Sequence, residues 1–175
     1  MGRIAFFILS LAFAMAGWKA SAQNTATLRE LFFASDSEVE VAVFAKVSAK
    51  QNQTMPINLA YTGVSAAMQA EYASGPWNKL RFFNDGKKAL EKAISMDPFN
   101  PEIRFLRFSI QSNIPALLMY SGDLDKDLLL IEQYLKSTPD IETGFWIKAL
   151  NVMLLAENAS ETQRKRIGTL LFSLS

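Results

Sequence analysis

Residues 86–98, with the sequence GKKALEKAISMDP, decide the fold class. Gly86, Leu90 and Ala93 recur at helical spacing, and the closing proline cannot continue a helix because it lacks a backbone N–H. The small residues let a second helix approach closely, and the leucine fills the joint. Residues 100–102, Asn-Pro-Glu, supply the cap and first-turn proline of another helix. The segment therefore predicts two helices joined by a tight turn.

Helix signals recur along the rest of the chain, and strand signals are scarce. Residues 35–38 form a capping-box pattern from Ser35 to Glu38, and small residues spaced along 56–73 offer a face for close packing. Alternating valines in 39–43 keep a strand open as an alternative to a helix there. The expected helices cover residues 25–34, 35–49, 56–73, 77–96, 101–113, 123–136, 141–157 and 160–174.

The spacing Gly86-x-x-x-Leu90-x-x-Ala93-x-x-x-x-Pro98 resembles the second helix of a tetratricopeptide repeat. A weaker likeness follows in residues 131–139, 41 residues further on, whereas the family repeats about every 34 residues. The resemblance implies a degenerate helical-repeat fold. The chain is also similar to short exported bacterial proteins of unknown function, a likeness that implies no activity.

These patterns together predict an all-α protein of antiparallel helical hairpins. Two architectures fit, a fragment of an α-solenoid of the tetratricopeptide-repeat type and an irregular helical bundle. We expect a single helical domain over residues 23–175, in which residues 23–55 form a looser N-terminal segment in one interpretation.

The N-terminal residues 1–22 have the pattern of a cleaved secretory signal. Arg3 precedes an apolar run over 4–17, and Ala20-Ser21-Ala22 provides the small-x-small cleavage site. A membrane anchor is the rival interpretation, but about 20 apolar residues are needed to span a bilayer. Because the chain has no cysteine, lipid attachment after cleavage is not expected. The sequence thus predicts a periplasmic or secreted protein without stable membrane insertion.

The charge balance and the absent residue types restrict the function. Loss of Arg3 and Lys19 leaves 16 of the 18 basic residues against 17 acidic ones, so no basic surface for nucleic acid is expected. With no histidine and no cysteine, serine–histidine and cysteine–histidine catalysis and histidine-ligated zinc are excluded. Catalysis by carboxylates alone stays open, with Glu71 and Glu91 as the candidate acids.

Acidic residues at 123, 125 and 127 imitate the start of a calcium loop. The EF-hand pattern requires glycine at the sixth position and glutamate at the twelfth, where this chain has Leu128 and Tyr134. Helix capping explains the three acids better. We therefore predict no metal site and no cofactor.

Arg104, Arg107 and Gln111 share one polar stripe on the helix expected after Pro101. A mostly apolar helix with a basic stripe is typical of a groove wall, where arginine grips carboxylate or phosphate with two parallel bonds. These three residues are the candidate partner-binding site. The alternative is a structural salt bridge to Glu71 or Glu91 on a neighbouring helix.

The sequence favours a non-enzymatic binding or scaffold protein that contacts a peptide or protein through a groove between helices. One alternative is a carrier of an apolar or amphipathic small molecule, because helical bundles can enclose a cavity. The other is a carboxylate-dependent hydrolase of the cell envelope.

The exported chain is expected to begin at Gln23 and to carry no lipid, because the cleavage site follows Ala22 and no cysteine is present. N-terminal sequencing and the intact mass of the exported protein test this. An intact Met1 in the membrane fraction would contradict it.

Overall fold

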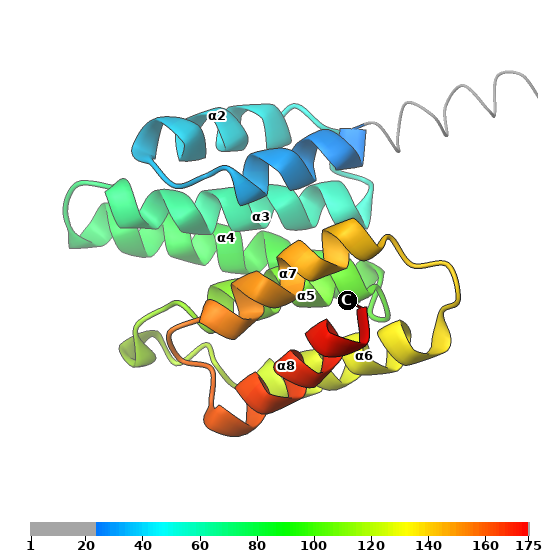
Figure 1. Ribbon diagram of the computed structural model, residues 1–175. Coiled ribbons are helices and arrows are strands. Elements are labelled where there is room, and N and C mark those ends of the chain that lie inside the picture. Colours follow the sequence, from blue (N-terminus) through cyan, green and yellow to red (C-terminus); the bar gives the residue numbers. More distant parts are fainter. Residues whose placement is uncertain (1–23, 175) are drawn as a thin grey trace, which may run out of the picture.

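The computed structural model describes residues 24–174, which form only helices and connecting segments, without a strand (Figure 1). The all-α prediction is therefore confirmed. The predicted signal, residues 1–22, lies outside the described part of the chain. The helical elements are residues 24–33, α2 (Glu38–Ser48), α3 (Pro56–Tyr72), α4 (Pro76–Met96), α5 (Pro101–Gln111), the 3₁₀ turn η1 (Ala116–Leu118), α6 (Leu124–Ser137), α7 (Thr143–Leu155) and α8 (Glu161–Leu174).

Prolines and caps set where several helices begin. Pro56, Pro76 and Pro101 each occupy the first turn of a helix, where the missing N–H costs nothing. The Asn100 side chain accepts hydrogen bonds from the backbone N–H groups of Glu102 and Ile103. The turn after residue 96 thus has the structure that the sequence predicted.

The helix predicted over residues 35–49 is confirmed as α2, and the strand alternative for residues 39–43 is wrong. Val41, Phe44 and Ser48 are buried at helical spacing, while Val39 and Val43 on either side of Val41 stay exposed. The capping box is also shifted by two residues: Ser37 accepts from the backbone N–H of Glu40, and the Glu40 carboxylate accepts from the N–H of Asp36. The cap lies there because the chain enters the helix only after residues 35–37.

Helices α3 and α4 form an antiparallel hairpin with unusually close backbones. A methyl group added to Gly86 would lie 2.5 Å from the carbonyl oxygen of Gly63 and 2.6 Å from the backbone nitrogen of Ala67. Leu90 and Ala93, one and two turns further along α4, are fully buried. The small residues that the sequence singled out on both helices therefore meet at this joint.

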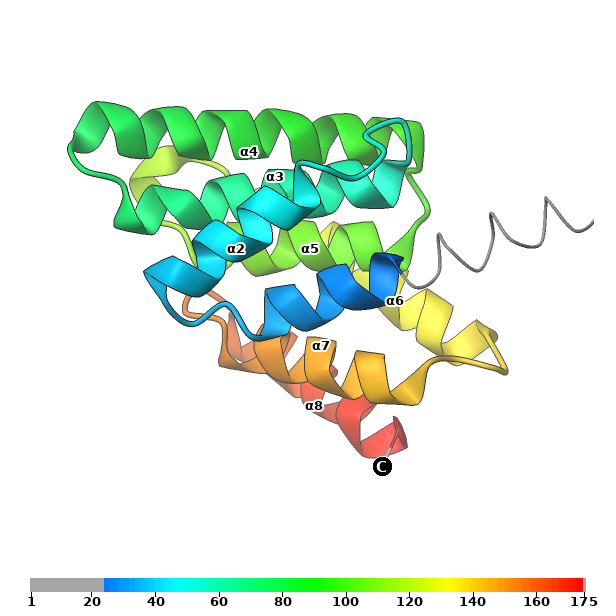
Figure 2. The same cartoon turned by 90° about the horizontal axis from the view of Figure 1, so that it is seen from above.

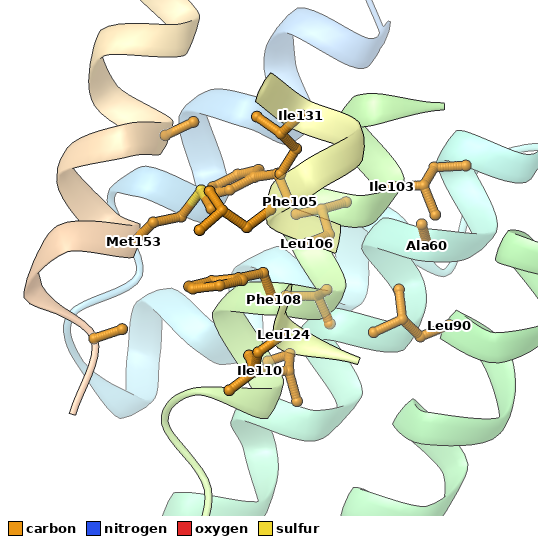
Figure 3. Packing of buried hydrophobic residues seen from close by; sticks show 14 of the residues in the cluster. Ala60, Leu90, Ile103, Phe105, Leu106, Phe108, Ile110, Leu124, Ile131 and Met153 are labelled. Carbon is orange, nitrogen blue, oxygen red and sulfur yellow. The ribbon is translucent and has the colours of Figure 1, made fainter. Parts of the chain in front are cut away.

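Helix α5 runs through the middle of the molecule, between the α3–α4 hairpin and the pair α7–α8 (Figure 2). Every residue from Glu102 to Gln111 is buried. Its apolar side chains meet those of the surrounding helices in one core (Figure 3). Leu28 and Phe44 add to the same core, so residues 24–48 pack against the rest of the domain.

No helix among residues 24–174 combines the length and the apolar character that crossing a membrane would require.

Replacing Gly86 with alanine is expected to destabilise the protein by about 1–3 kcal/mol, because the new methyl group meets the α3 backbone, which cannot move aside alone. Gly168→Ala in α8 is the matched control. A methyl group there meets nothing within 4 Å, so alanine should stabilise the helix by about 0.5–1 kcal/mol. Urea unfolding measures both; a Gly86→Ala variant as stable as the parent would disprove the close contact.

Candidate functional site

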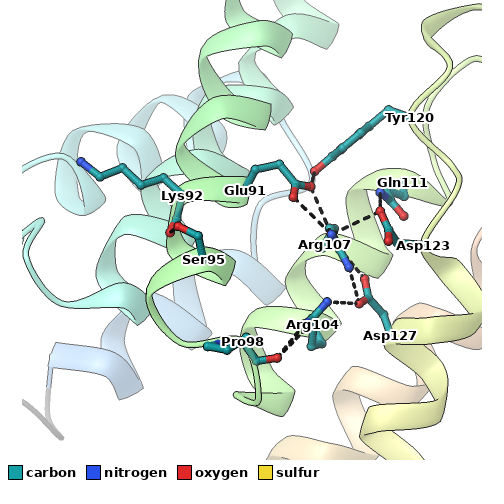
Figure 4. Close-up of polar contacts among 10 residues, drawn as sticks. All are labelled: Glu91, Lys92, Ser95, Pro98, Arg104, Arg107, Gln111, Tyr120, Asp123 and Asp127. Carbon is teal, nitrogen blue, oxygen red and sulfur yellow. Dashed lines mark hydrogen bonds and ion pairs between the residues drawn. The ribbon is translucent and has the colours of Figure 1, made fainter.

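The three residues predicted to bind a partner lie inside the molecule, around a buried carboxylate of α6 (Figure 4). Arg107 grips Asp127 with two parallel bonds, Nε to Oδ2 and Nη2 to Oδ1, both 2.7 Å long. Arg104 adds a bond of 3.0 Å from Nη1 to Asp127 Oδ1. Its other nitrogens donate to the carbonyl oxygen of Pro98 at 3.0 and 2.6 Å. The Asp127 carboxylate thus accepts hydrogen bonds from both arginines.

Further acidic groups surround Arg107 from α4 and from the turn before α6. Its Nη1 lies 3.2 Å from the Glu91 carboxylate and 3.3 Å from that of Asp123. Burial alone would lower the pKa of Arg107. The hydrogen bonds and charge of Asp127, followed by the charges of Glu91 and Asp123, outweigh burial, so the pKa of Arg107 is raised and the guanidinium stays charged.

The phenol of Tyr120 completes this cluster by donating a hydrogen bond to Glu91. Burial, together with the bond to Glu91 and the charge of that carboxylate, raises the pKa of Tyr120 well above its ordinary value. The phenol therefore keeps its proton and joins the segment before α6 to α4.

Gln111 is fully buried at the end of the stripe. Its Nε2 lies 3.5 Å from Asp123 Oδ2, and its Oε1 has no hydrogen-bond partner. With Arg104 and Arg107 only 5% and 3% exposed, the stripe faces α4 and α6 and not solvent. These contacts match the alternative that the sequence left open, a structural ion pair, with Glu91 but not Glu71 among its partners.

The acids at 123, 125 and 127 face arginines of α5 and α8 and do not converge on one point. Asp127 serves the two arginines of α5, Asp123 lies beside Arg107, and Asp125 pairs with Arg166 of α8 at 3.3 Å. Nowhere in residues 24–174 do three or more acidic side chains converge as metal ligands would. Their spacing instead lets α6 join α5 and α8.

The candidate catalytic acids do not share a cleft. Gly63 of α3 lies against Gly86 of α4. Glu71 lies eight residues beyond Gly63 along α3, and Glu91 lies five residues beyond Gly86 along α4. Because the two helices are antiparallel, these residues lie on opposite sides of the joint. At a rise of 1.5 Å per residue their separation along the axis is roughly 20 Å. Paired carboxylates in glycoside hydrolases are separated by about 5–9.5 Å, so these two cannot act as a pair.

A second buried cluster, which the sequence did not suggest, joins residues 24–33 to α5. Arg29 donates to both oxygens of Glu102, at 2.8 and 2.6 Å, and the Tyr61 phenol donates to the same carboxylate at 2.6 Å. Nothing in the local sequence pairs residues 29, 61 and 102. The cluster is structural, because it fixes the N-terminal helix on the body of the protein.

An open groove of about 740 Å³, hereafter the end groove, lies at the end of the α3–α4 hairpin. It lies where α3 ends, α4 begins and the chain leaves α5. Apolar side chains predominate among its lining residues, which are Ala67, Met68, Ala70, Glu71, Pro76, Lys79, Leu80, Phe83, Ile110, Asn113, Ile114, Pro115, Leu117, Leu118 and Glu157.

One wall of the end groove is an apolar segment, residues 114–119, with the sequence IPALLM. Leu117 and Met119 in it are 89% and 88% exposed. Met119 has a backbone φ of 48°, a left-handed conformation that is costly for a side chain of this size. Ile114 and Leu118 are half-buried against the core, whereas Leu117 and Met119 face solvent. The sequence interpretation missed this apolar run, which is the one local signal that could have indicated the groove.

The apolar segment is held in place from the α7–α8 connection. The backbone N–H of Asn158 donates to the carbonyl oxygen of Ser112 at 2.8 Å, and its side-chain amide donates to that of Ile114 at 2.9 Å. The N–H of Glu157 also donates to the side chain of Asn113. These bonds tie the start of the apolar segment to the α7–α8 connection.

Comparison with protein families, with curated proteins and with solved structures finds no match for the chain.

Replacing Arg104 and Arg107 together with glutamine is expected to destabilise the protein by roughly 3–5 kcal/mol, because the change leaves Asp127 buried without a counter-charge. Arg166→Gln is the control, since its ion pairs with Asp125 and Glu132 are closer to solvent and should be worth about 0–1 kcal/mol. Chemical unfolding separates the two cases. A double variant of undiminished stability would contradict the structural role of the arginines.

Proposed function

We propose that the protein is a non-catalytic binding module that takes an apolar segment of a protein partner into the end groove. The observation that carries the proposal is the juxtaposition of the groove with the exposed side chains of Leu117 and Met119. Leu80 and Leu117 line the groove and reach solvent, and Trp77, one turn before Leu80, is 82% exposed. Exposed apolar surface beside a concavity is typical of protein interfaces.

The proposed contact replaces the arginine stripe as the binding surface. The stripe is internal and satisfied by carboxylates, whereas the end groove is open and its apolar atoms are exposed to water. Covering them with a partner releases that water, which is the dominant favourable contribution to most protein association. Export by the predicted signal would place the groove outside the cytoplasm, among partners of the periplasm or medium.

A carrier of an apolar or amphipathic small molecule is the second candidate. The volume of the end groove falls in the range of about 300–1,000 Å³ that small-molecule sites occupy. A carrier encloses most of its ligand, however, and Leu117, which lines the groove, is itself 89% exposed. The open shape therefore supports a protein partner better.

Replacing Leu80 and Leu117 together with aspartate is expected to abolish partner capture. Both side chains are at least 39% exposed, so the free energy of unfolding should change by less than about 1 kcal/mol. Phe99→Asp is the control: it removes an apolar side chain that is 81% exposed in the turn after α4, about 30 Å of helix away from the groove.

Capture is measured from envelope extract with the parent, the groove variant and the control variant, followed by mass spectrometry. The expected result is a protein retained by the parent and by Phe99→Asp and lost with the groove variant. Equal capture by all three would contradict the proposal. A lipid or other small molecule that co-purifies without a protein, and is lost with the groove variant, would establish the carrier instead.

A further inference from the structure

The polar surroundings of the end groove restrict the partner further. Four carboxylates, hereafter the acidic corner, lie at the end of α3 and the start of α2: Glu71 on α3, and Asp36, Glu38 and Glu40 in and just before the first turn of α2. Glu71 lines the groove itself, and the start of α2 lies beside the end of α3 in both views (Figures 1 and 2). Burial and then the charges of these four groups raise the pKa of the Tyr72 phenol, which places all four within electrostatic reach of it.

No ion pair within residues 24–174 joins a basic side chain to the acidic corner. Among residues 24–174, ion pairs occupy other carboxylates, namely those of Glu91, Glu102, Asp123, Asp125, Asp127, Glu132 and Glu142. Helix α3 has no basic residue in its last turn, so the negative end of its dipole adds to the charge of Glu71.

The nearest cations on α4 already have contacts. The ammonium of Lys79 donates to the backbone carbonyl oxygen of Glu71 at 2.9 Å, and so offsets the helix end but forms no ion pair with the Glu71 carboxylate. The guanidinium of Arg81 lies over the ring of Phe82, 5.1 Å from its centre. Glu157 adds a further exposed carboxylate to the groove lining. The rim is therefore apolar with an excess of negative charge.

The shape of the groove selects among the ways in which peptides bind. Addition of a strand requires an exposed sheet edge, and the described residues contain no strand. Polyproline segments dock in grooves lined by aromatic rings, and Phe83 is the one aromatic residue among the lining residues. Aliphatic side chains and the adaptable Met68 instead suit the apolar face of a helix.

We infer that the partner segment is a cationic amphipathic helix, whose apolar face lies in the end groove and whose lysines or arginines meet the acidic corner. This inference rests on the proposed function and adds the sign of the partner's charge and its secondary structure.

Two synthetic peptides of about 18 residues, or five helical turns, test the inference. They share one leucine and alanine face at helical spacing and differ only in carrying lysine or glutamate at the polar positions. Fluorescence anisotropy measures their binding to the purified protein at low and high salt. We expect the lysine peptide to bind at least about tenfold more tightly at low salt, and the difference to shrink as salt screens the charges.

Charge-reversal variants test whether the acidic corner causes the preference for the lysine peptide. Glu38→Lys combined with Glu71→Lys should remove the preference for the lysine peptide. Asp140→Lys, an exposed site between α6 and α7, should leave it unchanged. The Leu80→Asp, Leu117→Asp variant should bind neither peptide, which excludes non-specific adhesion.

The outcomes separate the two levels of the proposal. Equal binding of both peptides through the groove, or preference for the glutamate peptide, would overturn the inference and leave the proposed function standing. Binding of neither peptide to the parent protein, together with capture unaffected by the groove variant, would overturn both. Circular dichroism of the bound lysine peptide should show helix; an extended bound peptide would also overturn the inference.

Discussion

The close approach of α3 and α4 at Gly63 and Gly86 is the constraint on which the remaining structure depends. Two backbones that nearly touch fix the distance and rotation of the helices, because any Cβ at the joint would collide with the opposite backbone. Leu90 and Ala93 then present a fixed surface on which α5 packs. The far end of the same hairpin supplies much of the end groove, so the geometry of the groove depends on this contact.

The interior of the protein combines this apolar joint with ion pairs that fix helix positions. Helix α5 is buried on all sides, and its arginines cannot reach water, so α6 and α4 must supply carboxylates. A buried pair adds little net stability but makes other arrangements costly, because each would leave a charge unpaired. Arg107 with Asp127 selects the register of α5 against α6, and Arg29 with Glu102 does so for residues 24–33.

Patterns within short stretches of the sequence predicted most of the helices. The environment of the candidate site residues depends instead on residues that are distant in the sequence. Prolines at 56, 76 and 101 and the small residues of the hairpin act within a few residues of themselves, so the helices and the close joint could be inferred. Arg104 and Arg107 look like a surface stripe because α5 alone does not show that Asp127, at least 20 residues away, will cover them. The end groove is assembled from four separate segments, namely the end of α3, the start of α4, residues 110–118 and Glu157, so no single local pattern predicts it.

Native-state hydrogen exchange, resolved by residue, tests most directly whether the α3–α4 joint is the fixed centre of the structure. The account predicts that amides around Gly63 and Gly86 exchange only through global unfolding, while those of residues 114–119 exchange through local opening of lower free energy. Joint amides that exchange through a smaller opening than those of α5 and α6 would contradict it.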